Sequence, residues 1–164
     1  MIPFKDRRDA GRLLAQALQK YKNHKDAVVL GLARGGVVVA YEVANALSLP
    51  LNVIAPRKIG APGMPELAIG SIMDTGEVIF NKAIIQMLNV SLNYLEKEIE
   101  LEKQKAQQRI NLYRQYAPLP NLQDKTVILV DDGIATGATM LVAIQGMRKA
   151  QVKHVVVAVP VASS

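Results

Sequence analysis

The chain has 164 residues, half of them hydrophobic and 21% charged, so we expect one globular domain with a sizeable core and not a disordered chain. There is no cysteine, which excludes disulfides and thiolate zinc sites, and the two histidines, His24 and His154, are too far apart in sequence to favour metal or triad chemistry. The net charge of +6 fits an anionic ligand.

The first predicted helix follows Asp6, which we interpret as its N-cap, and its apolar residues recur at helical spacing as far as Tyr21. Arg7, Arg8 and Arg12 give this helix a basic first turn, which opposes the helix dipole. The arginines either serve another purpose or form a solvated face, and we favour the solvated face.

A buried strand is predicted at 27–32, followed by a loop that contains Arg34, Gly35 and Gly36 and then by a helix over 37–47. Adjacent glycines let the backbone approach a polyanion, and a guanidinium offers paired donors to it. Glycine pairs after strands also form simple tight turns, so this segment alone does not decide between the two interpretations.

A third strand is predicted at 51–55, and its end meets a charged loop at 56–63, where prolines and glycines are expected to prevent any regular element. Arg57 and Lys58 stand at the carboxyl end of this strand. They are placed to meet a pyrophosphate group, although two surface charges in a loop would explain them as well.

The middle of the chain predicts a β-hairpin, a short helix and a long helix. Apolar runs at 67–73 and 77–80 flank Asp74-Thr75-Gly76, which is typical of a hairpin turn. A short helix at 81–89 precedes a long one that Ser91 caps and that reaches about Tyr116. The apolar stripe of the long helix (Leu92, Leu95, Ile99, Ala106, Ile110 and Tyr113) packs either on the domain or on a second subunit, so we expect a homo-oligomer.

The segment TVILVDDGIATGATM, residues 126–140, is the most informative part of the chain. Its first five residues form a strand buried on both faces, Asp131 and Asp132 follow, and a loop of small residues leads into a helix over 138–150. Such a loop can close its N–H groups around a phosphate at the positive end of a helix. An exposed turn is the alternative, but it would not need the Thr-Gly-Ala-Thr sequence. A last strand is predicted at 155–161.

VILVDDGIATGAT resembles the phosphoribosyl-pyrophosphate (PRPP) motif of the type I phosphoribosyltransferases, and among them it is similar to uncharacterised members known only as predicted phosphoribosyltransferases. Thirteen consecutive positions fit the motif. The resemblance implies that Asp131 and Asp132 hold the ribose hydroxyls and the loop holds the 5-phosphate. It also implies that Arg34, Gly35 and Gly36 contact the pyrophosphate.

The resemblance further implies a Mg²⁺-dependent reaction in which PRPP loses pyrophosphate and a small nitrogen acceptor, such as a nucleobase, adds at the anomeric carbon. Asp131, Asp132, Arg34 and Lys58 are the expected catalytic residues, and the two aspartates would meet the metal indirectly, through PRPP hydroxyls or water. The expected PRPP-binding residues are Arg34, Gly35, Gly36, Arg57, Lys58, Asp131, Asp132, Gly133, Ala135, Thr136, Gly137, Ala138 and Thr139.

Two departures from the family pattern leave the acceptor open. Enzymes for 6-oxopurines carry an acid where this chain has Ala135, whereas adenine enzymes have a small residue there. Type I enzymes also continue with another strand and a hood that holds the nucleobase, but this sequence stops at Ser164. Either the hood is built from the 57–116 region or the chain is a shortened member with compromised acceptor binding.

The strands and their helical connections predict an α/β fold, a parallel sheet with helices on both faces, Rossmann-like, with an inserted hairpin flap and a long helix. We expect a single phosphoribosyltransferase-like domain at 1–164, with a core at 1–58 and 117–164 and a flap or hood insertion at about 59–116. Because ligands of such sheets lie beyond the carboxyl ends of the strands, several candidate residues should converge there: Arg34, Arg57, Lys58, Asp131 and Thr136.

Two other functions remain open at this stage. The chain could be a PRPP-sensing regulator without catalysis, with a basic face for nucleic acid, or another phosphate-binding α/β protein. No GxxxxGK[ST] or GxGxxG motif is present, which disfavours the last of these. Aromatic residues are few and basic residues scattered, which disfavours a nucleic-acid partner. No apolar run approaches the roughly 20 residues that span a bilayer, so we expect a cytoplasmic protein without a membrane partner.

Overall fold

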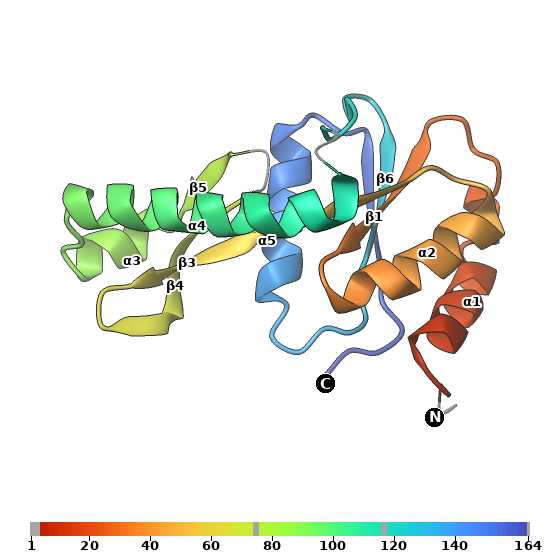
Figure 1. Ribbon diagram of the computed structural model, residues 1–164, viewed down its shortest axis with the longest axis horizontal. Coiled ribbons are helices and arrows are strands. Elements are labelled where there is room, and N and C mark those ends of the chain that lie inside the picture. The colour runs from red at the N-terminus through yellow and green to blue at the C-terminus, as the bar shows by residue number, and fades with distance from the viewer. Residues whose placement is uncertain (1–3, 74–75, 116–117, 164) are drawn as a thin grey trace.

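The computed structural model describes residues 4–73, 76–115 and 118–163. It consists of a four-stranded sheet covered by helices, and a smaller three-stranded sheet that extends to one side with the longest helix along it (Figure 1). The elements in chain order are α1 (Arg7–Ala17), a 3-10 turn (Gln19–Tyr21), β1 (Ala27–Leu32), α2 (Gly35–Leu47), β2 (Leu51–Ile54), β3 (Arg57–Ala61), β4 (Met64–Ile72), β5 (Val78–Phe80), α3 (Lys82–Met87), α4 (Leu92–Arg114), β6 (Thr126–Val130), α5 (Ala138–Lys149) and β7 (His154–Ala158).

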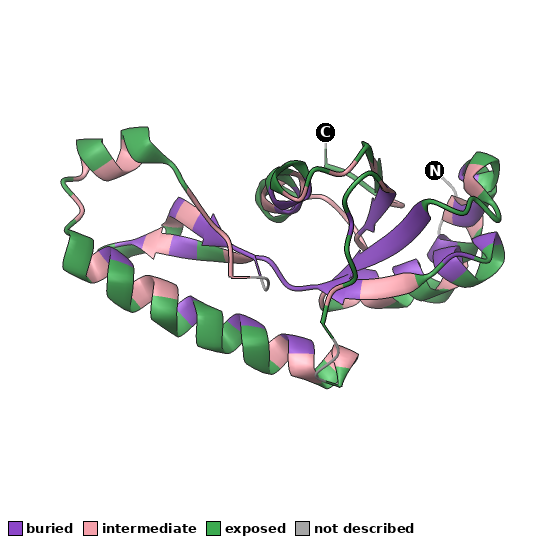
Figure 2. Cartoon of the chain, turned by 90° about the horizontal axis from the view of Figure 1, so that it is seen from above, coloured by how far each residue is buried: buried purple, intermediate pink, exposed green. Residues whose placement is uncertain are grey.

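The four-stranded sheet is parallel and has the order β2-β1-β6-β7, as the alternation of strands and helices predicted. Alternate residues of the two central strands face opposite layers. Val29 and Ile128 pack under α1 and α2, whereas Leu30 and Leu129 pack under α5. The sheet therefore has helices on both faces, and its central strands are buried throughout (Figure 2).

The second sheet contains the predicted hairpin and one strand more. β4 and β5 pair antiparallel around a turn whose Asp74 and Thr75 lie outside the described residues. β3 pairs antiparallel with β4, so the prediction that 56–63 would hold no regular element is wrong. Gly60 makes this pairing possible, because a Cβ there would lie only 2.7 Å from the carbonyl oxygen of Pro65. This sheet begins at Arg57, slightly before the predicted insertion.

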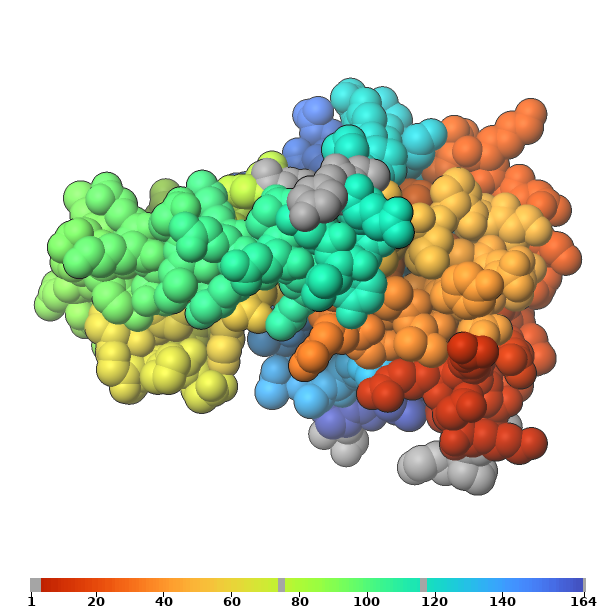
Figure 3. Space-filling view, viewed as in Figure 1, coloured from red at the N-terminus to blue at the C-terminus, as the bar shows by residue number. Residues whose placement is uncertain are grey.

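The long helix α4 connects the two sheets. Ser91 caps it as predicted, with its Oγ accepting from the N–H of Tyr94. It ends at Arg114, and the predicted end at about Tyr116 lies outside the described residues. Leu95 packs on the second sheet and Ile110 packs beside β2, whereas Leu92 is exposed, contrary to its place in the predicted stripe. Figure 3 shows α4 (green) across this face, meeting the orange segment that includes α2.

Two further boundaries differ from the sequence predictions. β7 ends at Ala158 and not at residue 161, because Pro160 has no N–H for the ladder and the chain beyond it turns to pair with the loop after β6. Gly35 and Gly36 form the first turn of α2 instead of a loop. The first N–H groups of any helix lack intrahelical partners, so glycine costs little at this position.

Gly31 lies where α2 packs closely against β1. A Cβ on Gly31 would lie 2.8 Å from the Cβ of Ala40 and 3.1 Å from the Cα of Val37. We predict that Gly31→Ala lowers the free energy of unfolding by about 1–3 kcal/mol, because α2 must move off the sheet. Urea unfolding measures this change. Val38→Ala, on the exposed face of the same helix, should stay within about 0.5 kcal/mol, and an unchanged midpoint for Gly31→Ala would contradict the prediction.

Candidate active site at the carboxyl end of the parallel sheet

The loop between β6 and α5 is fixed at its base and open at its tip. The N–H of Ile134 donates to the carbonyl oxygen of Val161 at 3.0 Å, and the N–H of Ser163 donates back to Ile134 at 2.8 Å. Gly137 has a φ of +76° and turns the chain into α5. The tip residues Ala135 and Thr136 are exposed. The loop is thus held in place where it leaves the sheet, while its tip faces outward.

The N–H groups of this loop are available for a ligand. Within the described part of the chain, the N–H groups of Gly133, Ala135, Thr136 and Gly137 donate to no protein acceptor. Thr136 itself contributes a hydroxyl, which accepts from the N–H of Ala138 at 3.4 Å. Unpaired N–H groups ahead of a helix N-terminus form a site of positive potential, which suits a phosphate dianion.

The acid pair lies directly against the first turn of α2. A Cβ on Gly36 would lie 2.8 Å from the Cα of Asp131, and one on Gly35 would overlap the carboxylate of Asp132. The glycine pair and the acid pair therefore lie in direct contact. The positive end of α2 faces both carboxylates, and it offsets part of their mutual repulsion.

Asp131 is the electrostatically perturbed member of the pair. Burial is the main cause that raises its pKa to about 6; the negative charge of Asp132 acts in the same direction, and a hydrogen bond from the Asp132 N–H to Oδ1 at 2.8 Å acts against both. A carboxyl that titrates near neutrality can exchange a proton as a ligand binds.

Arg7 supplies a cation to the pair that the sequence interpretation did not foresee. Its Nε donates to Oδ2 of Asp132 at 2.8 Å, and a second guanidinium nitrogen lies 2.8 Å from the same oxygen. The interpretation of the basic first turn as only a solvated face is wrong for Arg7. Oδ1 of Asp132 accepts no hydrogen bond from the described residues, so one oxygen of that carboxylate stays available.

Arg34 lies between the end of β1 at Leu32 and the start of α2, and it is exposed. The peptide bond between Ala33 and Arg34 is cis, and the guanidinium makes no ion pair among the residues that the structure describes. Arg34 thus immediately precedes the glycines that touch the acid pair, with its charge free for a ligand.

Arg57 and Lys58 lie on β3 and not in a loop, and each is already paired. Arg57 Nε donates to Oε2 of the buried Glu102 at 2.7 Å, and Lys58 Nζ donates to Oε2 of the exposed Glu66 at 2.6 Å. Burial raises the pKa of Glu102, but hydrogen bonds from Arg57 and Lys105 outweigh it and hold the pKa below its usual value. Arg57 is therefore a fixed cation, whereas Lys58 has a solvated partner that it can leave.

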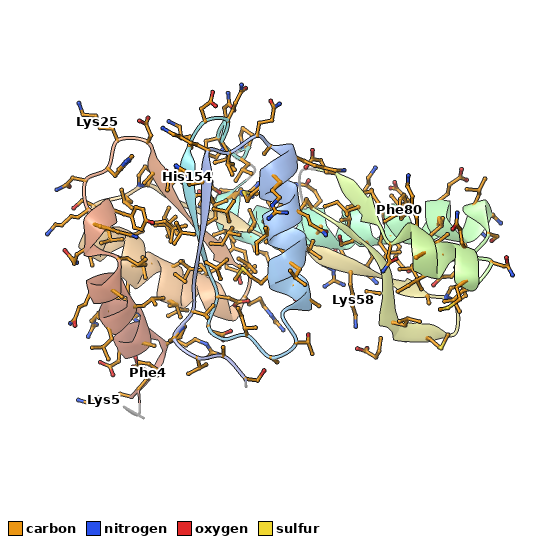
Figure 4. All side chains as sticks on the ribbon, turned by 180° about the vertical axis from the view of Figure 1, so that it is seen from behind. Phe4, Lys5, Lys25, Lys58, Phe80 and His154 are labelled. Atoms are coloured by element: carbon orange, nitrogen blue, oxygen red, sulfur yellow. The ribbon has the colours of Figure 1, made fainter. Side chains whose placement is uncertain are left out.

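A cleft of about 840 Å³ brings part of the predicted site together. The second sheet contributes Arg57 and Lys58 to its lining. The loop between β6 and α5, with the start of α5, contributes Thr136, Ala138 and Thr139. The described lining of the cleft does not include the acid pair, Arg34 or the two glycines. Ala33 does line the cleft, and Arg34 and the glycines that contact the acid pair follow it directly in the chain. Figure 4 shows Lys58 and Phe80 on the same side of α5.

Three charged residues at or beside the cleft were not predicted from the sequence: Glu102, Lys82 and Arg109. The position of Glu102 could have been predicted, because it falls on the apolar stripe of α4 between Ile99 and Ala106, where an acid must be buried and therefore paired. Lys82 and Arg109 also line the cleft, and nothing in their sequence neighbourhood indicates this position.

The described residues place limits on metal and membrane binding. They contain no group of three or more His, Asp or Glu side chains that could hold a metal ion by itself. Among the helices of this same part of the chain, none is long and apolar enough to cross a membrane.

Comparison with known proteins assigns a family. The model of the phosphoribosyl transferase domain matches residues 5–79 and 65–164. A protein of Mycobacterium tuberculosis H37Rv, named "Putative phosphoribosyl transferase Rv0571c", is 42% identical over 161 residues, which are 96% of this chain and 35% of the relative. The chain thus spans about a third of the length of the curated relatives it matches.

Solved structures show the same fold. The crystal structure of TT1426 from Thermus thermophilus is 43% identical and has a TM-score of 0.85, covering 98% of this chain and 76% of that one. A purine phosphoribosyltransferase from Pyrococcus horikoshii shares 23% identity with a TM-score of 0.51, over 92% of this chain and 68% of that one. A hypoxanthine phosphoribosyltransferase from Staphylococcus aureus shares 14% identity with a TM-score of 0.54, over 94% and 62%. The likeness to these last two concerns the fold alone.

The raised pKa of Asp131 predicts a pH-dependent gain in stability when the carboxyl is replaced. Its pKa rises from about 3.8 in the unfolded chain to about 6 in the folded one, so its contribution to stability is present below pH 4 and is lost as the pH rises through 6. Asp131→Asn should therefore raise the free energy of unfolding by about 1–2 kcal/mol at pH 8, after allowance for solvent screening, and change it little at pH 4.

Urea unfolding followed by circular dichroism at pH 4, 6 and 8 measures this difference. Asp26→Asn removes a carboxylate that is 69% exposed and serves as the matched control, with no expected change in pH dependence. An equal effect of Asp131→Asn at pH 4 and pH 8 would contradict the assignment.

Proposed function

The chain belongs to the phosphoribosyl transferase domain family, and from that premise we propose that it transfers the 5-phosphoribosyl group of PRPP to a nitrogen acceptor with release of pyrophosphate. The name of the M. tuberculosis relative supports this activity, and the purine and hypoxanthine enzymes share the fold. We place the protein in the cytoplasm, as a homo-oligomer.

One observation carries the proposal. The unpaired N–H groups of the loop at 133–137 follow directly on an acid pair at the carboxyl end of β6. PRPP presents a phosphate dianion and two vicinal hydroxyls on one sugar, so it needs anion donors and hydroxyl acceptors next to each other. This chain offers both the anion donors and the hydroxyl acceptors, and backbone hydrogen bonds hold the loop in place where it leaves the sheet.

We assign the loop from Gly133 to Thr139 to the 5-phosphate, and Asp131 and Asp132 to the ribose hydroxyls. Oδ1 of Asp132 is the available acceptor, while Arg7 holds Oδ2 and fixes the carboxylate. As the bond between the anomeric carbon and the pyrophosphate oxygen breaks, the two carboxylates face a ribose ring that gains positive charge. Their negative charge stabilises it.

The leaving pyrophosphate gains negative charge at the same time. We assign it to Arg34, to the N–H groups of Gly35 and Gly36 at the start of α2, and to Arg57 and Lys58. Lys58 can exchange its exposed partner Glu66 for the leaving group, whereas Arg57 stays tied to Glu102 and contributes a fixed positive charge. The acceptor nitrogen bonds to the anomeric carbon as the bond to the pyrophosphate oxygen breaks, and its proton passes to the released pyrophosphate or to solvent.

The residues present fit a magnesium ion that PRPP itself brings. Mg²⁺ in phosphate sites keeps several of its waters and binds substrate oxygens, so Asp131 and Asp132 would meet the ion indirectly, through the PRPP hydroxyls or water. The bound ion would supply charge neutralisation for the pyrophosphate.

We propose that the second sheet with α3 and α4, about 59–116, serves as the flap and hood of the one domain.

Calorimetric titration with PRPP and Mg²⁺ tests the proposal. We expect wild-type binding in the micromolar range and Asp132→Asn to weaken it about 10- to 100-fold, because a charge-assisted hydrogen bond to a hydroxyl is lost. Asp26→Asn, which changes an exposed acid immediately before β1 at the opposite end of the sheet, should bind PRPP like the wild type.

A screen for pyrophosphate release with nitrogen heterocycles then separates two functions. Release with one of them supports the transferase. Binding of PRPP without release from any acceptor would favour a PRPP-sensing regulator. An absence of PRPP binding at millimolar concentration would contradict both.

A further inference from the structure

The positive charge of the chain is concentrated at the end of the four-stranded sheet opposite the candidate active site. Three segments lie there: 19–26 before β1, 121–125 before β6, and 148–153 before β7 (Figure 1). They hold seven of the 20 lysines and arginines of the chain but only two of its 14 acids. This excess of five accounts for nearly all of the net charge of +6, so the rest of the chain is close to neutral. Figure 4 shows Lys25 and His154 at this end.

Backbone hydrogen bonds hold the three segments side by side. The N–H of Thr126 donates to the carbonyl oxygen of Asp26 at 2.8 Å, and the N–H of Lys153 donates to that of Lys125 at 2.8 Å. Neighbouring strands lie about 4.8 Å apart, so the residues that precede β1, β6 and β7 form one row along the amino edge of the sheet. Basic residues that are scattered along the sequence therefore gather on one surface.

Local structure accounts for only some of these cations. Those in the last turns of helices complement the helix dipole. Lys25, Lys125 and Lys153 lie in no helix, and Lys25 and Lys153 form no ion pair with any residue that the structure describes. Lys125 lies 3.7 Å from the carboxylate of Asp26, which is 69% exposed, so this pair adds little stability. Neighbouring cations repel each other, and a polyanion across the row would remove that repulsion.

The side chains of this surface select among polyanions. None of the exposed large apolar side chains of the described residues lies in the three segments, whereas helices that bind at a membrane surface bury such side chains in it. Tyr21, the one aromatic residue of these segments, is half-buried, so the bases of a single strand find no exposed ring on which to stack. Lysine binds phosphate as a point charge and lacks the planar fork with which arginine reads guanine. The surface therefore fits the phosphates of a duplex.

We propose that the amino ends of β1, β6 and β7 form a surface that binds the phosphate backbone of duplex nucleic acid, without regard to its sequence. Contacts to phosphates alone position a duplex but carry no sequence information. This surface lies at the other end of the sheet from the loop at 133–137, so a duplex and PRPP can bind the same chain independently.

Fluorescence anisotropy with labelled duplexes tests the proposal, using DNA and RNA of one sequence and a second DNA of unrelated sequence. We expect binding that weakens between about 50 and 200 mM salt, with a slope of about −3 in log K against log salt, because each phosphate contact contributes about −0.9. The two DNA sequences should bind alike, and the DNA and RNA arms show which duplex is preferred.

Paired variants locate the binding surface. Lys25→Gln combined with Lys153→Gln should lower the affinity for the duplex about tenfold and reduce the slope by about 2. Lys97→Gln combined with Lys103→Gln removes the same charge from exposed positions on α4 and should leave the affinity within about twofold. PRPP titration of the first pair should match the wild type, so the proposed function can stand or fall separately.

Equal losses in the two paired variants would overturn the proposal, because the net charge alone would then explain binding. So would an absence of duplex binding at the lower salt concentration, or tighter binding of a single strand than of its duplex. Binding of vesicles of phosphatidylcholine and phosphatidylserine without binding of duplex would assign the surface to a membrane instead. A loss of PRPP binding in the first paired variant would contradict the independence of the two ends.

Discussion

The close approach of β6 to the N-terminus of α2 is the constraint on which the rest of the site depends. Only glycine fits at positions 35 and 36, because any Cβ there would collide with Asp131 or Asp132 or with the strand backbone. The approach fixes two carboxylates against the positive end of one helix. It also fixes the direction in which the chain leaves the sheet, and thus where the loop that leads to α5 lies.

This geometry concentrates opposite charges in a small volume. The two acids repel each other, which together with burial raises the pKa of Asp131, and Arg7 and the dipole of α2 offset part of that repulsion. A few residues further on, the loop presents N–H groups without acceptors among the described residues. A ligand that is anionic at one end and rich in hydroxyl groups beside it would satisfy both halves of the site, which is why we favour PRPP.

The second sheet completes the site from the other side. Arg57 is fixed by Glu102 on α4, so the helix that spans both sheets also sets the position of a cation at the cleft. Lys149 of α5 donates to the carbonyl oxygen of Val78 at 3.1 Å, and Gly146 packs against Met73, so α5 is tied to the hairpin as well. The cleft thus lies between elements that contact each other directly, and its cations come from three different elements.

The sequence predicted those parts of the fold that local patterns encode. Continuous apolar runs located β1 and β6, and the Ser91 cap located α4, because burial on both faces and capping leave direct traces in the sequence. The strand at Arg57 was missed, since proline and glycine around it indicate a loop and only its pairing with β4 makes it a strand. Arg7 with Asp132 and Lys82 with the cleft were missed because these positions depend on contacts across more than fifty residues.

Hydrogen–deuterium exchange with saturating PRPP and Mg²⁺ tests the central claim most directly, because it reads the backbone N–H groups themselves. We predict slower exchange in peptides that cover residues 33–37 and 133–140, where unpaired N–H groups gain phosphate acceptors, and little change in α1 beyond its first turn. Bound PRPP that leaves exchange at both segments unchanged, with protection elsewhere, would contradict it.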